Sequence, residues 1–198
     1  MQPRAGRAIS MDYYEDKKKV QSYINFTPSN DGSMLVDKLV EALPQGSRVL
    51  EIGIGPGKDF DLLARHFDVV GSDYSQEFLR LYRLRNDHAH LLHLDARTLQ
   101  TDLTFDAIFS NKALIHMSRK ELRGSFVRQR DVLNTEGLIL HSFWYGREEQ
   151  EFEGLRLIQH TEQELESMLE DYFEILDIGR HAKMSEDDSV YVLARKKN

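Results

Sequence analysis

Three glycines at alternate positions are the feature of this sequence most readily tied to chemistry. They stand in Glu51-Ile52-Gly53-Ile54-Gly55-Pro56-Gly57, directly after the apolar run 48–52, and a helical pattern begins at Lys58. Because glycine has no Cβ, this segment can turn sharply and bring its backbone close to a ligand. The start of the following helix adds free N–H groups and the positive end of its dipole. The segment therefore predicts a ligand-binding loop beyond the carboxyl end of a strand.

Two carboxylates stand where the next two apolar runs end. Asp73 closes the run 69–73, and Asp95 follows the run 91–94. Each residue alone fits a helix cap or a turn equally well. At successive strand ends after a glycine loop, Asp73 is placed to accept hydrogen bonds from the paired hydroxyls of a ribose. Asp95 is placed to reach an adenine ring lying across the strand ends.

Two common nucleotide-binding motifs do not fit the glycine loop. A nicotinamide-binding loop reads Gly-x-Gly-x-x-Gly, and here Lys58 occupies the position of its last glycine. A P-loop needs Gly-Lys-Ser/Thr after four spacer residues, which this sequence lacks. A nicotinamide oxidoreductase is therefore the least favoured alternative.

The elements that must position these residues alternate between short apolar runs and helical patterns, which is typical of βαβ units and a mostly parallel sheet. Ser75 is placed to cap one helix, and capping boxes begin at Ser118 and Thr161. No helical pattern separates 173–178 from 190–194, so these two runs predict an antiparallel pair at the sheet edge. Parallel strands are expected at 48–52, 69–73, 91–94, 105–110 and 138–144.

Size and composition restrict the function. The 198 residues suit one domain: we expect a flexible tail at 1–10 and a single domain at 11–198, with 11–30 as an N-terminal lid segment. The net charge of -7 argues against a nucleic-acid partner. The absence of cysteine excludes a thiolate nucleophile. No apolar run is long enough to span a membrane, so we expect no membrane partner and a cytoplasmic location.

The sequence resembles the class I S-adenosylmethionine-dependent methyltransferases, in particular the small-molecule branch. The resemblance runs from about Leu35 to Lys196, and its motifs are Val-Leu-Glu-Ile-Gly-Ile-Gly-Pro-Gly (49–57), Val-Gly-Ser-Asp-Tyr-Ser (70–75), Leu-Asp-Ala (94–96) and Phe-Asp-Ala-Ile-Phe-Ser-Asn (105–111). It implies an α/β, Rossmann-like doubly wound sheet of seven strands with helices on both faces. It also implies S-adenosylmethionine as the cofactor and S-adenosylhomocysteine as the product.

The resemblance assigns expected contacts along the cofactor. Around its amino-acid part it implies Glu51 as an acceptor beneath, together with Gly53, Ile54, Gly55 and Gly57. Around the nucleoside it implies Asp73 at the ribose, Tyr74 against the adenine, and Asp95 and Ala96 at the adenine edge. Near the sulfonium it implies Asn111, Lys112 and Ala113.

Methyl transfer is an in-line displacement from an activated sulfonium, so the protein mainly supplies alignment. His116 is the candidate base for an acceptor that carries a proton, and the alternative is a polar residue that fixes its loop or touches the cofactor. Tyr14, in the expected lid, is the second candidate catalytic residue, since its ring or phenol could stabilise the sulfonium. A surface helix with amphipathic tyrosines explains that segment equally well.

The expected function is methyl transfer to a small-molecule O or N acceptor by a monomer or homodimer. A macromolecular (protein or RNA) methyltransferase and a non-catalytic S-adenosylmethionine-binding regulatory protein are the alternatives. No metal site is expected, because in an extended segment His88 and His90 face away from His93 and Asp95. Residues 147–153 are expected to form an acidic surface loop.

Overall fold

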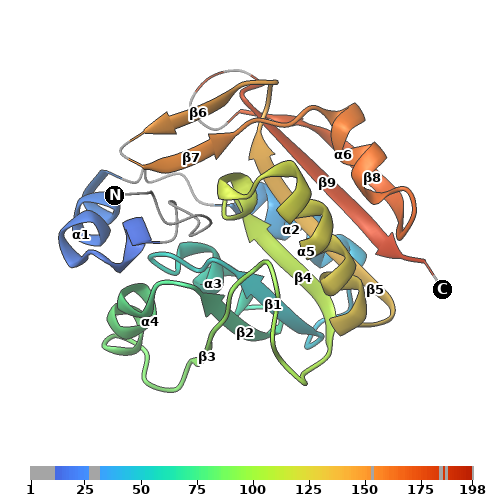
Figure 1. Cartoon of the computed structure of the whole chain (residues 1–198). Helices are drawn as coiled ribbons and strands as arrows, with labels where there is room; N and C mark the ends of the chain where they lie inside the picture. Colours follow the sequence, from blue (N-terminus) through green and yellow to red (C-terminus); the bar gives the residue numbers. More distant parts are fainter. Residues whose placement is uncertain (1–11, 27–31, 153, 183–184, 186, 198) are drawn as a thin grey trace.

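The computed structural model describes residues 12–26, 32–152, 154–182, 185 and 187–197. Seven strands form one sheet in the order β3-β2-β1-β4-β5-β9-β8 (Figure 1). The first five are parallel, whereas β9 is antiparallel to β5 and β8 is antiparallel to β9. The strands are β1 (Arg48–Ile52), β2 (Asp68–Asp73), β3 (His90–His93), β4 (Phe105–Asn111), β5 (Leu133–Trp144), β8 (Phe173–His181) and β9 (Ser189–Lys196). The predicted doubly wound fold with an antiparallel edge pair is confirmed.

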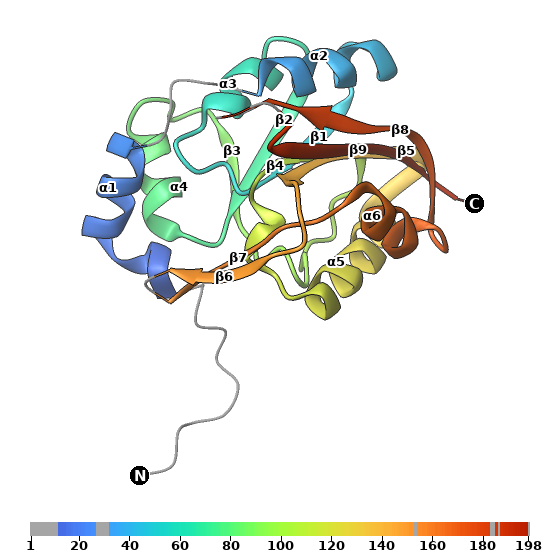
Figure 2. The same cartoon turned by 90° about the horizontal axis from the view of Figure 1, so that it is seen from above.

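Helices cover both faces of this sheet (Figure 2). One face carries α2 (Ser33–Ala42), α3 (Lys58–Leu63) and α4 (Gln76–Arg83), and the other carries α5 (Arg119–Val132) and α6 (Glu162–Leu169). The remaining helices are η1 (Asp12–Glu15), α1 (Lys17–Phe26) and η2 (Leu114–His116). Among the described residues, no helix has the length and apolar character needed to cross a membrane.

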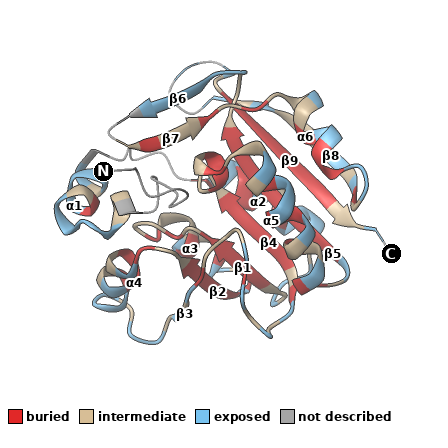
Figure 3. Ribbon diagram, in the orientation of Figure 1, coloured by how far each residue is buried: buried red, intermediate tan, exposed pale blue. Residues whose placement is uncertain are grey.

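Alternation along the strands supplies two separate cores. In β1, Leu50 belongs to the core that also contains residues of α5 and α6, while its neighbour Val49 belongs to the core that contains residues of α2 and α3. Ile108 and Phe109 divide between the two cores in the same way in β4. The central strands are therefore buried on both faces (Figure 3), as parallel strands between helical layers must be. A site must therefore form at the ends of the strands, and in open α/β sheets it forms at their carboxyl ends.

The predicted helix starts carry the expected caps. The Ser75 hydroxyl accepts a hydrogen bond from the Phe78 N–H, and Ser118 forms a complete capping box with Glu121. At α6, the Thr161 hydroxyl accepts from the Glu164 N–H. The carboxylate of Glu164 contacts other side chains instead of closing a box.

The acidic segment 147–153 is the main correction to the expected fold. A β-hairpin stands there, made of β6 (Glu149–Phe152) and β7 (Leu155–Ile158). The glutamates of β6 have low strand propensity, so the sequence did not predict a strand there. Leu155 and Ile158 of β7 are buried and anchor the hairpin. β7 packs against η2, and in both views the end of β6 and the start of β7 lie on the side of the molecule that carries the N-terminal helices (Figures 1 and 2).

Candidate active site

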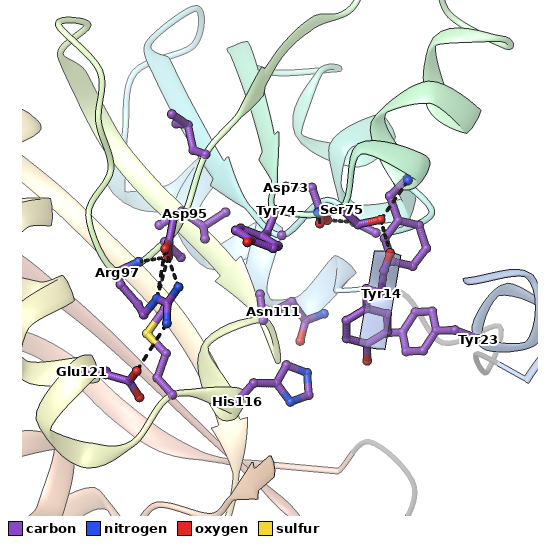
Figure 4. A pocket seen from close by; sticks show the side chains of 18 residues that line it. Tyr14, Tyr23, Asp73, Tyr74, Ser75, Asp95, Arg97, Asn111, His116 and Glu121 are labelled. Carbon is purple, nitrogen blue, oxygen red and sulfur yellow. Dashed lines mark hydrogen bonds and ion pairs between the residues drawn. The ribbon is translucent and has the colours of Figure 1, made fainter. Parts of the chain in front are cut away.

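A cavity lies at the carboxyl ends of β1 to β4 (Figure 4). Most of the residues that the sequence nominates line it, although they come from separate segments. The nominated residues on its walls are Tyr14, Gly53, Gly55, Asp73, Tyr74, Asp95, Ala96, Asn111, Ala113 and His116.

The glycine loop forms one wall through a backbone conformation that other residues rarely adopt. Gly53 has φ +76° and Gly55 has φ +48°. A Cβ at position 53 would lie 2.4 Å from the Cβ of Ala113, so the chain passes close to the loop after β4. The N–H of Gly55 donates to Oδ2 of Asp73 over 3.0 Å, which fastens this loop to the end of β2.

Asp73 is held by two backbone donors. Besides the bond from Gly55, its Oδ1 accepts from the N–H of Ser75 over 2.8 Å. Burial raises the pKa of Asp73 to about 6, and these backbone hydrogen bonds oppose the rise. The group is therefore largely ionised at pH 7, and each oxygen keeps a lone pair for a further donor.

Glu51 lies just outside the cavity wall and is buried without compensation. The side chain is 2% exposed, and its Oε2 has no hydrogen-bond partner among the described residues. Burial, followed by the neighbouring carboxylates of Asp59, Asp73 and Asp61, raises the pKa of Glu51 well above its usual range. A buried acceptor without a donor is costly, so the position calls for a cationic or donor group beside the glycine loop.

Asp95 has a partner that the sequence analysis did not identify. Arg97 binds its carboxylate through Nε, at 3.0 Å from each oxygen, and through a terminal nitrogen at 2.6 Å. Arg97 also contacts Glu121 at 3.5 Å, and both residues line the cavity. A basic residue two positions after Asp95 was the feature of the sequence that could have predicted this ion pair.

Asn111 is fixed from both ends of its amide. Its Nδ2 donates to Asp59 over 2.9 Å, and its Oδ1 accepts from the Ser142 hydroxyl over 2.7 Å. The other oxygen of Asp59 accepts from the N–H of Gly32. Asp59 and Ser142 were not among the predicted site residues, because only the folded sheet and α3 bring them to Asn111.

Besides Glu51, three further nominated residues are absent from the cavity lining: Lys112, Ile54 and Gly57. The ammonium of Lys112 donates to the carbonyl of Phe143 and sits 4.3 Å from the ring centroid of Trp144. The Ile54 side chain is in the core, and Gly57 (φ +81°) precedes α3.

His116 is held in one tautomer by the hairpin. Its Nδ1 lies 2.7 Å from the carbonyl oxygen of Arg156 in β7. A carbonyl can only accept, so Nδ1 carries the proton and the neutral ring keeps a lone pair at Nε2. Burial lowers the pKa of His116, although the bond to the carbonyl opposes this effect.

The expected lid meets the cavity in its described part, 12–26. The ring of Tyr14 lies 5.8 Å from that of His116 and 5.6 Å from that of Tyr23. Its carbonyl accepts from the Ser75 hydroxyl over 2.6 Å. Burial raises the pKa of Tyr14, so the phenol keeps its proton. The tail at 1–10, Met11 and residues 27–30 lie outside the described residues.

Comparison with known proteins agrees with this geometry. A family described as "Methyltransferase domain" matches residues 49–137, from β1 to the early part of β5. A trans-aconitate 2-methyltransferase of Variovorax paradoxus is 38% identical over 76 residues. That match covers 36% of this chain and spans 29% of the relative's own length.

Solved structures share the whole fold. The 1,6-didemethyltoxoflavin-N1-methyltransferase of Burkholderia thailandensis, solved with S-adenosylhomocysteine, has a TM-score of 0.79 at 18% identity, covering 100% of this chain and 94% of that one. The N-methyltransferase NodS of Bradyrhizobium japonicum has a TM-score of 0.73 at 14% identity, covering 94% and 100%. With the family match over residues 49–137, these similarities agree with the resemblance seen in the sequence: this part of the chain matches a methyltransferase domain, and the fold is that of the solved methyltransferases.

Proposed function

We propose that this protein transfers a methyl group from S-adenosylmethionine to an oxygen or nitrogen of a small molecule. The observation that carries the proposal is the unpartnered, buried Oε2 of Glu51 two residues before the close-packed Gly53. A cofactor with an ammonium and a sulfonium would bring positive charge and N–H donors close to this buried carboxyl group beneath the glycine loop. The neighbours named as N-methyltransferases support a small-molecule acceptor.

The described residues fit this cofactor along the cavity. Gly53 and Gly55 leave room for its amino-acid part, and Glu51 lies beneath it. Asp73 retains a lone pair on each oxygen for the two ribose hydroxyls. When bound, S-adenosylmethionine supplies the activated methyl group.

The nucleoside end is assigned to Tyr74, Asp95 and Ala96. Tyr74 lines the cavity next to Asp73 and offers its ring to the adenine. Asp95 is assigned to the adenine amino group as an acceptor, and the Ala96 N–H to the ring edge.

His116 serves as the base for the acceptor. Its Nε2 lone pair is the proton-accepting site, because Nδ1 already donates to Arg156. The lowered pKa keeps the imidazole neutral and able to accept a proton at pH 7. Tyr14 stands against the same ring and contributes an aromatic face and a protonated phenol near the reacting groups.

Calorimetric titration with S-adenosylmethionine and S-adenosylhomocysteine tests the cofactor assignment. We expect micromolar binding that Asp73→Ala abolishes and Asp73→Asn weakens. Asp68→Ala is the matched control, because Asp68 is an exposed aspartate at the opposite end of the same strand. If neither S-adenosylmethionine nor S-adenosylhomocysteine bound the folded wild type, the proposal would be overturned.

A screen of small amines and phenols for S-adenosylhomocysteine production then tests turnover. Methylation of at least one, lost in His116→Gln, supports the proposed acceptor class. Turnover only with protein or RNA would point to a macromolecular methyltransferase. Cofactor binding without turnover on any acceptor would point to a regulatory protein.

A further inference from the structure

A chain of hydrogen bonds runs through the interior between the end of β4 and the loop after β3. Oγ of Ser110 lies 2.8 Å from Nδ1 of His141, and Nε2 of His141 lies 2.7 Å from Oε1 of Gln129. Gln129 Nε2 donates to the Ser125 hydroxyl over 3.1 Å, and that hydroxyl donates to the carbonyl of Ala96 over 2.7 Å. The four side chains are all 0% exposed.

The last acceptor of this hydrogen-bond chain determines which group donates and which accepts in every bond. The carbonyl of Ala96 can only accept, so Ser125 must donate to it and accept from the amide of Gln129. Oε1 of Gln129 therefore accepts from Nε2–H of His141, and Nδ1 of His141 accepts from Ser110. Burial lowers the pKa of His141 to about 3, which agrees with the neutral tautomer that this order requires. The chain is satisfied throughout and has one arrangement.

The loop that receives this bond forms the nucleoside end of the cavity. Ala96 lines the cavity, between Asp95 and Arg97. α5 holds the same loop at a second point, where Arg128 donates to the carbonyls of Leu99 and Thr101 over 3.1 and 3.2 Å. Leu99 has φ +40°, a conformation that needs such support.

A buried polar network in which every group is hydrogen-bonded fixes one geometry, whereas apolar packing imposes no such direction on its neighbours. Ser125 and Gln129 lie one helical turn apart, so apolar residues there could pack against β5. Because the chain ends on the carbonyl of Ala96, it sets the orientation of the neighbouring peptide groups. It also links that loop to Ser110, the residue before Asn111 in the cavity wall.

We propose that Ser125 and Gln129 are positioning residues for the recognition of adenine, acting through the Ala96 carbonyl. This inference rests on the proposed function, since it concerns the nucleoside of the same cofactor. Loosening the bond lets the Asp95–Ala96 segment shift, so its contacts to the adenine edge weaken while those to the ribose persist. We therefore expect the preference for adenine over another purine base to decrease.

The test measures dissociation constants of the full chain for S-adenosylhomocysteine and for S-inosylhomocysteine, which lacks the amino group and carries N1–H. The wild type is expected to favour the adenine compound. Ser125→Ala and Gln129→Met should each reduce that preference about fivefold to tenfold, the effect of about one hydrogen bond. Ser125→Thr keeps the hydroxyl and should retain the preference.

Val132→Ala is the control, because Val132 is buried on α5 but takes no part in the hydrogen-bond chain from Ser110 to Ala96. It should lower the Tm and leave the preference unchanged. Hydrogen exchange of the amides of 95–99 gives a second measurement, expected to rise in Ser125→Ala and Gln129→Met but not in Val132→Ala. An unchanged preference with unchanged exchange would overturn the inference. Binding of neither compound by the wild type would overturn the proposed function, and the inference with it.

Discussion

Nδ1 of His116 donates a hydrogen bond to the backbone carbonyl of Arg156, across 40 residues of sequence. The bond joins η2, which follows β4, to the β6–β7 hairpin. Because the partner is a backbone atom, the tautomer of His116 depends on the position of the hairpin and not on any side chain at position 156. The hairpin thereby sets which ring nitrogen can accept a proton.

This arrangement predicts how turnover depends on pH. The pKa of His116 is lowered by burial, so Nε2 becomes protonated only below the ordinary histidine value of 6.5. We expect kcat/KM, measured with a phenol acceptor that does not itself titrate between pH 5 and 8, to be flat above that pH and to fall below it. A half-maximal rate above pH 6.5 would contradict a buried base.

Removal of the imidazole tests the same role at constant pH. His116→Gln should lower kcat about 10²- to 10⁴-fold, the usual contribution of a base, and leave the dissociation constant of S-adenosylhomocysteine nearly unchanged. His90→Gln, at an exposed position, should leave both unchanged. Equal loss of affinity and turnover in His116→Gln would instead indicate that the residue only fixes its loop.

Asp73 should couple cofactor binding to proton release. Its pKa of about 6 in the free protein means that about nine tenths of the molecules carry the protonated acid at pH 5. Ribose hydroxyls donate to the carboxylate, so the affinity for S-adenosylhomocysteine should be about tenfold weaker at pH 5 than at pH 7. Calorimetry in two buffers of different ionisation enthalpy at pH 6 should detect the released proton. Asp73→Asn should bind weakly with no such pH dependence, and a flat profile in the wild type would refute the coupling.

His141 should make the folded state sensitive to acid. Its pKa falls to about 3 in the folded protein, against 6.5 for an ordinary histidine. Between these values the unfolded chain binds more protons, so the free energy of unfolding falls as the pH is lowered from 6.5 toward 3. The slope from this one group is at most about 1.4 kcal/mol per pH unit.

Denaturant unfolding at pH 7, 5.5 and 4.5 measures this effect. His141→Gln is expected to be less stable than the wild type at pH 7 but to lose less further stability on acidification. His88→Gln is the control, since His88 is 95% exposed, and should follow the wild-type profile. Parallel profiles for His141→Gln and the wild type would contradict the assignment.

The parts of the fold that could be predicted depend on local patterns. The end of β1, the glycine loop and the cap at Ser75 need only residues close in sequence. The hairpin could not be predicted in this way, because β6 is rich in glutamate and its stability comes from Leu155 and Ile158 packing against distant residues.

The site shows the same division. Asp73 follows from its place at a strand end, but its partners do not follow from sequence spacing. The pairing of Asn111 with Asp59, 52 residues away, exists only once β4 and α3 lie together. The direction of a side chain is equally hidden: Lys112 adjoins Asn111, yet its φ of +60° accompanies an ammonium bound to the carbonyl of Phe143.

Two glycine substitutions should have opposite effects on stability. Gly53→Ala places a methyl group 2.4 Å from the Cβ of Ala113, at φ +76°, so both collision and backbone strain act. Gly124→Ala lies within α5, where an added Cβ meets nothing within 4 Å. Urea unfolding should show Gly53→Ala destabilised by about 1–3 kcal/mol and Gly124→Ala stabilised by about 0.5–1 kcal/mol.

Cofactor affinity separates the two variants further. Gly53→Ala should also lose binding of S-adenosylhomocysteine, because relieving the collision must move the glycine loop or the loop that carries Ala113, and both form cavity walls. Gly124→Ala should bind as the wild type does, since Gly124 lies outside the cavity lining. Wild-type affinity in a folded Gly53→Ala would show that the close approach of the two loops is not what shapes the site.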